Sequence, residues 1–387
     1  METDRPSGDP VLVEKLRAEI AENGPITFAR FMAVALGDPE RGYYAVSDAR
    51  PTRSGDYLSA PELHPVFGAI IARVLDEAWR ALERPDRFLV REYGAGNGRL
   101  VLDTLAGLRA IDSGLLERLR YEAVEIVERR AAMLEERLEA AGFGHVVQAR
   151  GAGERPVVGC VLANEFLDAL PVHRLGRSGG LLREVYVGWT DDDGGRFVDS
   201  PGGPSTPALA ERLAAEGIEL GEGQQAEVCL EIDSWAADMS AAVERGFAVL
   251  VDYGRRAEVL YGPARRAGTL RAYRDHRVHD DLYVAVGRQD LTAHVDFTAV
   301  ERATARHGWR TLGLTSQAEF LVGAGLGQLL LGRQADPAMS IGEYTSLRAS
   351  IGRLLDPLAL GGFQVLVLGR GLPDGTTLAG LEFEGPR

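Results

Sequence analysis

Hydrophobic positions recur at two spacings along the chain, and the two kinds of segment alternate. Short apolar runs, which are typical of buried strands, are separated by longer segments with helical periodicity. Three of these runs are FLVREY from Phe88, GCVLA from Gly159 and FAVLVD from Phe247. Strands that alternate with helices predict an α/β fold with a mainly parallel sheet and helices on both of its faces.

The remaining elements follow from the same pattern. Helices are expected at 11–23, 27–36, 65–82 and 129–140, and Thr27 is placed to cap the second of them. Further strands are expected at 121–125, 146–148, 183–189, 309–314 and 363–368. The Gly/Pro-rich stretch 194–207 is expected to be a loop. These elements predict an N-terminal helical or lid segment at 1–84 and a Rossmann-like core at 85–387, with insertions at about 176–245 and 255–300.

Composition narrows the class of protein. The chain has 387 residues, of which 45% are hydrophobic, so it can bury a sizeable core. Its net charge of -14 argues against a nucleic-acid-binding protein, because nucleic acid attracts a basic surface. The sequence has no apolar run long enough to span a bilayer, and its acidic N-terminus does not resemble a targeting peptide. We therefore expect a cytoplasmic protein without a membrane or nucleic-acid partner.

The cysteines point to the same compartment. Cys160 and Cys229 each lie inside an apolar run, so buried free thiols in a reducing environment are expected. The sequence contains no CxxC motif and no Cys/His cluster, so no metal site is expected.

The most informative segment is the glycine-rich turn after the strand at Phe88. Gly94, Gly96 and Gly98 follow the acid Glu92 at alternate positions. A dinucleotide-binding GxGxxG motif would need its third glycine at the position of Arg99, so that motif is absent. A GxGxG turn after an acid-terminated strand is typical of S-adenosylmethionine-dependent methyltransferases. A glycine turn in an unrelated α/β protein is the alternative.

Polar residues also follow two other predicted strands. Glu125 ends the strand after the glycine turn, and its two carboxylate oxygens can accept both ribose hydroxyls of an adenosine. Asn164, Glu165 and Asp168 follow the strand at 159–163, at the edge where open α/β sheets bind ligands. A carboxylate there could orient a cationic guanidinium for methyl transfer. The alternatives are a solvated acid at Glu125 and a helix cap at Asp168.

Together these motifs resemble the MidA-like methyltransferases, whose mitochondrial members serve respiratory complex I assembly. The matching segments are GPITFARFMAVALGDPERGYY (24–44), SGDYLSAPEL (54–63), EYGAGNGRL (92–100), ANEFLDALPVHRL (163–175), VDYG (251–254), TLRAYRDHRVHDD with DLTAHVDFTAV (269–300) and GLTSQAEFL (313–321). The resemblance implies a class I methyltransferase fold and S-adenosylmethionine as methyl donor. It also implies protein arginine as the acceptor in the mitochondrial branch.

The resemblance also assigns residues. Gly94, Gly96 and Gly98 fall on the family's donor-binding turn, and Glu125 falls on its ribose-binding acid. The donor set expected here adds Glu92 and Asn164 to these residues. The family's turn usually reads GPGRG, whereas this chain has GAGNG with Asn97 in place of the arginine, so any contact made by that arginine is lost.

Three functions fit these observations. The first is methylation of a protein side chain, most readily an arginine nitrogen, with Glu165, Asp168 and Glu62 as the residues that orient the acceptor. The second is methylation of a small molecule on the same fold. The third is a donor-binding assembly factor with little catalysis, and a homodimer is compatible with all three.

Overall fold

The computed structural model describes residues 8–46, 59–148, 157–274 and 277–383. The chain folds into two compact units. The first unit comprises Met1–Tyr57, Leu167–Trp235 and Gly254–Ala303, and the second comprises Leu58–Phe166, Ala236–Tyr253 and Thr304–Arg387. The boundaries of these units differ from the segments 1–84 and 85–387 expected from the sequence. The division into a lid segment and a methyltransferase core stays a prediction.

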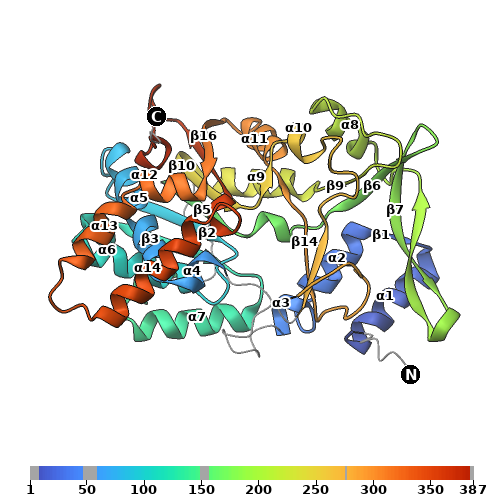
Figure 1. Cartoon of the computed structure of the whole chain (residues 1–387), viewed down its shortest axis with the longest axis horizontal. Coiled ribbons are helices and arrows are strands. Elements are labelled where there is room, and N and C mark those ends of the chain that lie inside the picture. The colour runs from blue at the N-terminus through green and yellow to red at the C-terminus, as the bar shows by residue number, and fades with distance from the viewer. Residues whose placement is uncertain (1–7, 47–58, 149–156, 275–276, 384–387) are drawn as a thin grey trace. The chain divides into compact units, whose positions relative to one another are not determined.

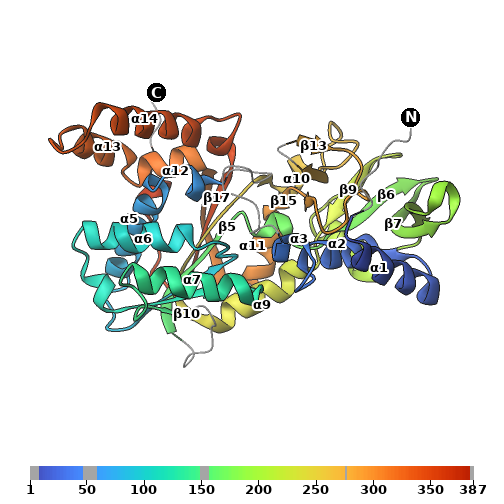
Figure 2. The same cartoon turned by 90° about the horizontal axis from the view of Figure 1, so that it is seen from below.

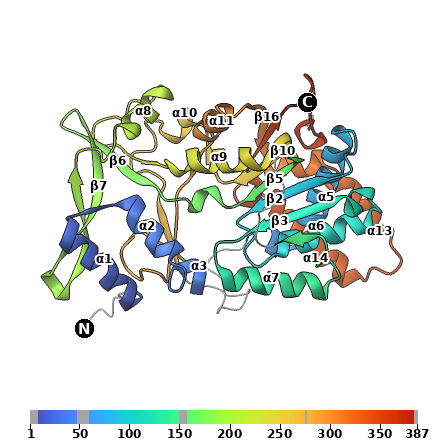
Figure 3. The same cartoon turned by 180° about the vertical axis from the view of Figure 1, so that it is seen from behind.

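The second unit contains a seven-stranded sheet in the order β16-β17-β10-β5-β2-β3-β4 (Figure 3). Its strands are β2 Phe88–Tyr93, β3 Leu119–Val124, β4 Val147–Gln148, β5 Val157–Asn164, β10 Val243–Asp252, β16 Trp309–Ser316 and β17 Gln364–Arg370. The neighbours from β10 to β4 pair in parallel, and β17 is antiparallel to both β10 and β16. The predicted α/β class with a mainly parallel sheet is therefore present in this unit.

Helices cover both faces of this sheet. Successive side chains of a strand point to opposite faces. On β2, Arg91 and Tyr93 both bond Asp238 of α9 (Glu231–Ala242). Val90, the residue before Arg91, points to the opposite face and belongs to the apolar core shared with the helices that flank β2 in the sequence.

The amphipathic helix expected at 65–82 is α5 Val66–Ala81. Its apolar side is fully buried in the core of the second unit, for example at Phe67 and Ile70. Burying one such side chain contributes about 1.5–3 kcal/mol. The other helices of this unit are α4 Ala60–Leu63, α6 Arg99–Ala110, α7 Glu128–Ala140, α12 Gln317–Gly323, α13 Leu326–Gln334 and α14 Ile341–Leu355, the last three of which lie together in Figure 2.

The first unit is built mostly on antiparallel strands. Its five-stranded sheet has the order β1-β7-β6-β9, with β8 paired to β7. The strands of this sheet are β1 Ile26–Thr27, β6 His173–Ser178, β7 Leu181–Thr190, β8 Arg196–Gly202 and β9 Gln225–Val228. Two smaller sheets contain β11 Gly254–Arg255, β12 Arg271–Arg274, β13 Arg277–His279, β14 Asp290–Thr292 and β15 Val295–Asp296. The loop predicted at 194–207 was wrong, because 196–202 form an edge strand whose pairing with β7 supplies the backbone hydrogen bonds.

Four longer helical segments complete the first unit. They are α1 Pro10–Asn23, α2 Phe28–Gly37, α8 Pro207–Ala215 and α11 Phe297–Ala305, the last of which ends in the second unit, and the short α3 Tyr43–Val46 and α10 Ala257–Leu260 accompany them. Figure 1 shows α1 and α2 beside the strands β1 and β7. Leu12, Leu16, Phe28 and Phe31 pack there in an apolar cluster with Val187 of β7.

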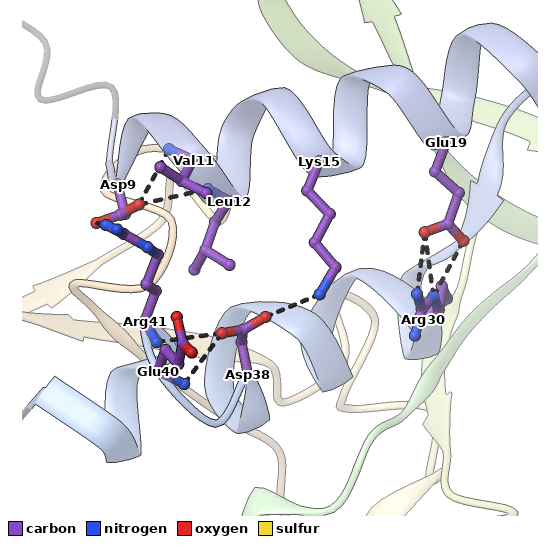
Figure 4. Close-up of polar contacts among 9 residues, drawn as sticks. All are labelled: Asp9, Val11, Leu12, Lys15, Glu19, Arg30, Asp38, Glu40 and Arg41. Atoms are coloured by element: carbon purple, nitrogen blue, oxygen red, sulfur yellow. Dashed lines mark hydrogen bonds and ion pairs between the residues drawn. The ribbon is translucent and has the colours of Figure 1, made fainter.

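Surface ion pairs join α1 to α2 (Figure 4). Lys15 binds Asp38 at 2.8 Å, and Arg30 binds Glu19 at 3.0 Å. Thr27 caps α2 as predicted, because its hydroxyl oxygen accepts the backbone N–H of Arg30. Exposed pairs of this kind contribute at most about 1 kcal/mol each, so the apolar cluster beneath them dominates the packing.

The two cysteines are free, with Cys160 fully buried on β5 and Cys229 partly buried after β9. Among the described residues, no helix has the length and apolar composition needed to cross a membrane.

Candidate functional site

The glycine turn leads from the end of β2 to the start of α6, as the sequence predicted. Gly94, Gly96 and Gly98 all have a positive φ, at 70°, 54° and 76°, a conformation that glycine adopts without a Cβ penalty. Gly98 occupies the position that caps α6. The backbone N–H of Gly94 donates to the Val124 carbonyl oxygen at 3.2 Å, which ties the turn to the end of the neighbouring strand.

The three glycines serve different purposes. A Cβ on Gly98 would lie 2.0 Å from Cδ1 of Leu134, and a Cβ on Gly94 would lie 2.9 Å from the Phe166 ring, so both glycines permit close packing. Beyond the immediate chain neighbours of Gly96, the nearest described atom to such a Cβ is 3.8 Å away. Among the described residues no side chain packs against Gly96, so this glycine leaves space at the carboxyl edge of the sheet.

Glu125 joins the two loops that follow β2 and β3. Its Oε2 accepts the backbone N–H of Gly96 at 3.1 Å, and its Oε1 accepts that of Val127 at 2.9 Å. A carboxylate has about four acceptor positions, so it can accept more than these two N–H groups. The next residue, Ile126, has a 70% exposed apolar side chain. An adenosine would match this arrangement, because its two ribose hydroxyls could donate to the acid and its adenine ring could lie on the apolar surface.

Glu92 lies below the turn and is buried. Its Oε2 accepts the hydroxyl of Tyr121 at 2.7 Å. Burial, helped by the charge of Glu125, raises the pKa of Glu92 to about 7, although the Tyr121 hydrogen bond opposes this shift. Near neutral pH this carboxyl group can therefore change charge at the base of the site.

The residues after β5 form the second wall of the site. Glu165 has a left-handed backbone, with φ of 50°, and its N–H donates to the Val251 carbonyl oxygen at 2.8 Å. The next N–H, that of Phe166, donates to Oδ2 of Asp252 at 3.2 Å. A non-glycine residue held in this conformation stores strain of about 1–3 kcal/mol, a feature that clusters at functional sites.

Asn164 presents an acceptor at the same edge. Its Nδ2 donates to Oε1 of Glu165 at 3.2 Å, while its Oδ1 is buried and accepts no hydrogen bond from a described residue. A buried acceptor of this kind requires a partner, such as water or a ligand N–H. This atom and the space at Gly96 fit a polar ligand bound across the ends of β2 and β5.

Helix α4 lies at this edge and brings in Glu62. Oε1 of Glu62 accepts Nδ2 of Asn97 at 3.1 Å, and its Oε2 accepts the N–H of Ser59 at 3.4 Å. The N–H of Ala60 donates to Oε1 of Glu165 at 3.3 Å. The structure thus places Glu62, Glu92, Glu125, Asn164 and Glu165 with the glycine turn in the second unit. Residues 54–58 of the SGDYLSAPEL motif lie outside the described residues.

Asp168 belongs to the first unit, in the 3-10 turn Leu167–Ala169. It is buried, and its carbonyl oxygen accepts the N–H of Ala293 at 3.2 Å. The hydroxyl of Tyr44 donates to Asp290 at 3.2 Å, and burial followed by the charges of Asp290 and Asp168 raises the pKa of Tyr44. Asp168 therefore shares an acidic, aromatic environment that sequence reasoning did not predict.

Sequence reasoning also overlooked three residues around the donor turn. Ile126 follows the acid that was identified, and its exposure can be seen only in the fold. Asp252 ends the strand at 247–252, so its position at a strand end was an available signal. Asn97 was treated only as a lost arginine, whereas its side chain binds Glu62.

Comparison with known proteins decides the family. A family model described as a putative S-adenosyl-L-methionine-dependent methyltransferase matches residues 70–315. The chain belongs to this methyltransferase family. The methyltransferase is similar to a mitochondrial protein arginine methyltransferase NDUFAF7 homolog from Drosophila melanogaster, with 30% identity over 341 residues that cover 81% of this chain and 75% of the relative. The human mitochondrial NDUFAF7 arginine methyltransferase is 28% identical over 367 residues, which cover 87% of this chain and 79% of the relative.

A solved structure agrees with the family. The methyltransferase superposes on a superfamily member from Burkholderia thailandensis, crystallised with S-adenosyl-homocysteine, with a TM-score of 0.84 and 32% identity. The match covers 96% of this chain and 94% of that one. The recognition of the family, the class I methyltransferase-like α/β fold and the dependence on S-adenosylmethionine are therefore confirmed.

Proposed function

We propose that this methyltransferase transfers the methyl group of S-adenosylmethionine to an arginine nitrogen of a protein. The observation that carries the proposal is the similarity, over more than four-fifths of the chain, to relatives named as protein arginine methyltransferases. The curated relatives are mitochondrial, and the cytoplasmic location expected from the sequence stays a prediction.

The second unit would hold the donor. Gly94, Gly96 and Gly98 would let the backbone approach it, and Glu125 would accept the ribose hydroxyls. Ile126 would provide an apolar surface for the adenine ring, because it is exposed directly after Glu125. Asn164 Oδ1, which accepts no hydrogen bond from a described residue, would accept an ammonium N–H of the methionine part, and Glu92 would offset the charge of that ammonium.

The acceptor would be positioned by carboxylates. Bound S-adenosylmethionine supplies an electrophilic methyl group on a sulfonium, and a nitrogen lone pair must be aligned with the bond that breaks. Arginine is cationic, so its nitrogen is a weak nucleophile unless a carboxylate orients it and stabilises the developing charge. Glu165, Asp168 and Glu62 are the proposed residues for this role. A proton leaves the methylated nitrogen, and a carboxylate or water accepts it.

The inserted segments at about 176–245 and 255–300 are proposed to serve the acceptor side. They hold β6–β9 and the small sheet β13-β12-β14, both of which belong to the first unit. Loops and insertions outside a catalytic core commonly determine which substrate is accepted.

The test is an incubation of the enzyme with isotope-labelled S-adenosylmethionine and a lysate of cells that lack it, followed by mass spectrometry of proteins and metabolites. The proposal expects labelled methylarginine in one or a few proteins. Label in a small metabolite with no protein methylarginine would move the assignment to a small-molecule methyltransferase. Tight donor binding with no labelled product would favour a donor-binding assembly factor.

A further inference from the structure

Two residues of helix α4 form hydrogen bonds with loops that follow strands of the second unit. The N–H of Ala60, its first residue, donates to Oε1 of Glu165 after β5 at 3.3 Å. Two residues later, Oε1 of Glu62 accepts Nδ2 of Asn97 in the glycine turn after β2 at 3.1 Å. Because β2 and β5 are neighbours in the sheet, α4 bridges adjacent strand ends, which is where open α/β sheets bind their ligands.

Asn97 is fixed for this contact from its other side. Its Oδ1 accepts the N–H of Arg99 at 3.0 Å, and its carbonyl oxygen accepts Nη1 of Arg137 at 2.7 Å. These bonds orient the amide so that Nδ2, the remaining donor, points to Glu62. The contact joins residues 35 positions apart in the sequence, so it holds two separate segments together.

Glu62 in turn has both carboxylate oxygens engaged. Oε1 binds Asn97, and Oε2 accepts the N–H of Ser59 at the start of α4. A carboxylate used in this way fixes the helix, because it binds the helix start with one oxygen and the glycine turn with the other.

We propose that Asn97 is a positioning residue. Its hydrogen bond to Glu62, called the clasp below, holds α4 at the glycine turn and thereby retains the methyl donor there. This inference rests on the proposed donor site. When the clasp is intact, donor and demethylated product leave slowly; when it is broken, both leave faster. Glu62 then holds α4 in addition to the acceptor-side role proposed above.

The clasp can be tested by removing the Asn97 donor and then supplying a donor from position 62 instead. Asn97→Asp places two carboxylates together, so the Kd for S-adenosyl-homocysteine should rise by about 10-fold, which corresponds to about 1.4 kcal/mol. The rise should come mainly from faster dissociation, and the KM for the donor should increase more than kcat changes. Asn97→Ala, which removes the bond without adding a charge, should shift the Kd in the same direction by a smaller factor.

The double variant Asn97→Asp with Glu62→Gln gives the decisive result. The new glutamine amide can donate to the new aspartate while its oxygen still accepts the Ser59 N–H, so the Kd should return to within about 3-fold of the wild-type value. Failure of Glu62→Gln to rescue Asn97→Asp, or an unchanged dissociation rate in Asn97→Asp and Asn97→Ala, would overturn the proposal.

Two controls separate the causes of failure. Glu19→Gln weakens an ion pair of α1 and α2 in the first unit (Figure 4) and should leave donor affinity unchanged. Gly96→Val should abolish donor binding. If Gly96→Val has no effect, the proposed donor site is wrong and the clasp falls with it. If Gly96→Val abolishes binding while Asn97→Asp leaves it unchanged, only the clasp is wrong.

Discussion

The two units bury acids in different ways. In the second unit, Arg91 and Glu122 are buried together as an ion pair at 2.7 Å, so each charge is compensated. In the first unit, the buried carboxyl groups of Glu216 and Asp296 lie within hydrogen-bonding reach of each other. Arg212 lies near this pair, with its Nε 4.0 Å from Oε1 of Glu216.

This difference determines how each unit responds to pH. A hydrogen bond between two carboxyl groups requires a proton on one of them, and no N–H or O–H of the described residues donates to either oxygen of Glu216. The second unit relies instead on apolar strands, such as β10 from Phe247 to Val251, whose burial is independent of pH. We expect the first unit to keep the proton of its acid pair up to about pH 8, whereas the buried Glu92 of the second unit loses its proton near pH 7.

The largest predicted effect is on the second unit's core. A chain that starts at residue 84 lacks α5, whose buried side chains each contribute about 1.5–3 kcal/mol. A domain is usually stable by only about 5–15 kcal/mol, so this chain should fail to fold. Loss of a cooperative thermal transition in circular dichroism would be the expected result. A truncated chain with full methyl-transfer activity would show that α5 is dispensable.

The next largest effect concerns catalysis. Glu165→Gln keeps an oxygen that can accept the N–H groups of Ala60 and Asn164, so donor affinity should be nearly unchanged. Methyl transfer should fall by about 100-fold, the usual effect of removing one positioned electrostatic group. Steady-state kinetics with labelled donor measure both quantities. Undiminished turnover would remove the proposed role of this carboxylate.

A smaller effect is expected for the buried acid pair. Burial, then the charge of Asp296 and its hydrogen bond, raise the pKa of Glu216 to about 8, and Arg212 and Arg302 partly oppose this. The pKa of Asp296 is also raised, first by burial, and Tyr261 lies beside it. The folded protein therefore holds a proton that the unfolded chain has lost, so stability is full at low pH and falls as pH rises through about 8.

Glu216→Gln should remove that fall, because an amide donates a hydrogen bond without titrating. The melting temperature of the wild type should drop between about pH 5 and pH 8, from the ordinary pKa of a glutamate to the raised pKa of Glu216, by about 2–4 °C for each kcal/mol lost. Glu92 titrates over part of this range in both proteins, so the difference between the two profiles reports Glu216. The variant should show a flatter profile. Parallel profiles of the two proteins would show that this pair does not control the response.

The comparison also explains what could be predicted from the sequence. β5 and β10 are apolar runs that end in polar residues, and both were identified, together with the glycine turn. In β6 only Leu175 is buried, and the edge strand β8 has one buried residue, Phe197, and ends in Pro201 and Gly202, which are typical of loops. Neither segment therefore has a strong strand signal in the sequence. These elements are stabilised by pairing with β7, a tertiary effect that a local pattern does not contain.

The site divides along the same line. Glu92 and Asn164 lie near the ends of β2 and β5, and Glu125 and Glu165 directly follow β3 and β5. Parallel strands deliver their ends to one edge, so the strand pattern of the sequence predicted that these residues lie close together. The contact of Glu62 with Asn97 depends on how a distant helix packs, and no spacing in the sequence indicates it.

The most direct test of the account is calorimetric titration of S-adenosyl-homocysteine into the wild type and Gly96→Val. Among the described residues, no side chain packs against Gly96, so the valine should occupy the donor's space while the protein stays folded, as checked by circular dichroism. Gly375→Val is the matched control, because Gly375 in the second unit also has a positive φ, of 78°, and no described atom beyond its chain neighbours lies within 4 Å of the added Cβ. The account predicts binding by the wild type and by Gly375→Val, and none by Gly96→Val. Unchanged affinity in a folded Gly96→Val protein would contradict it.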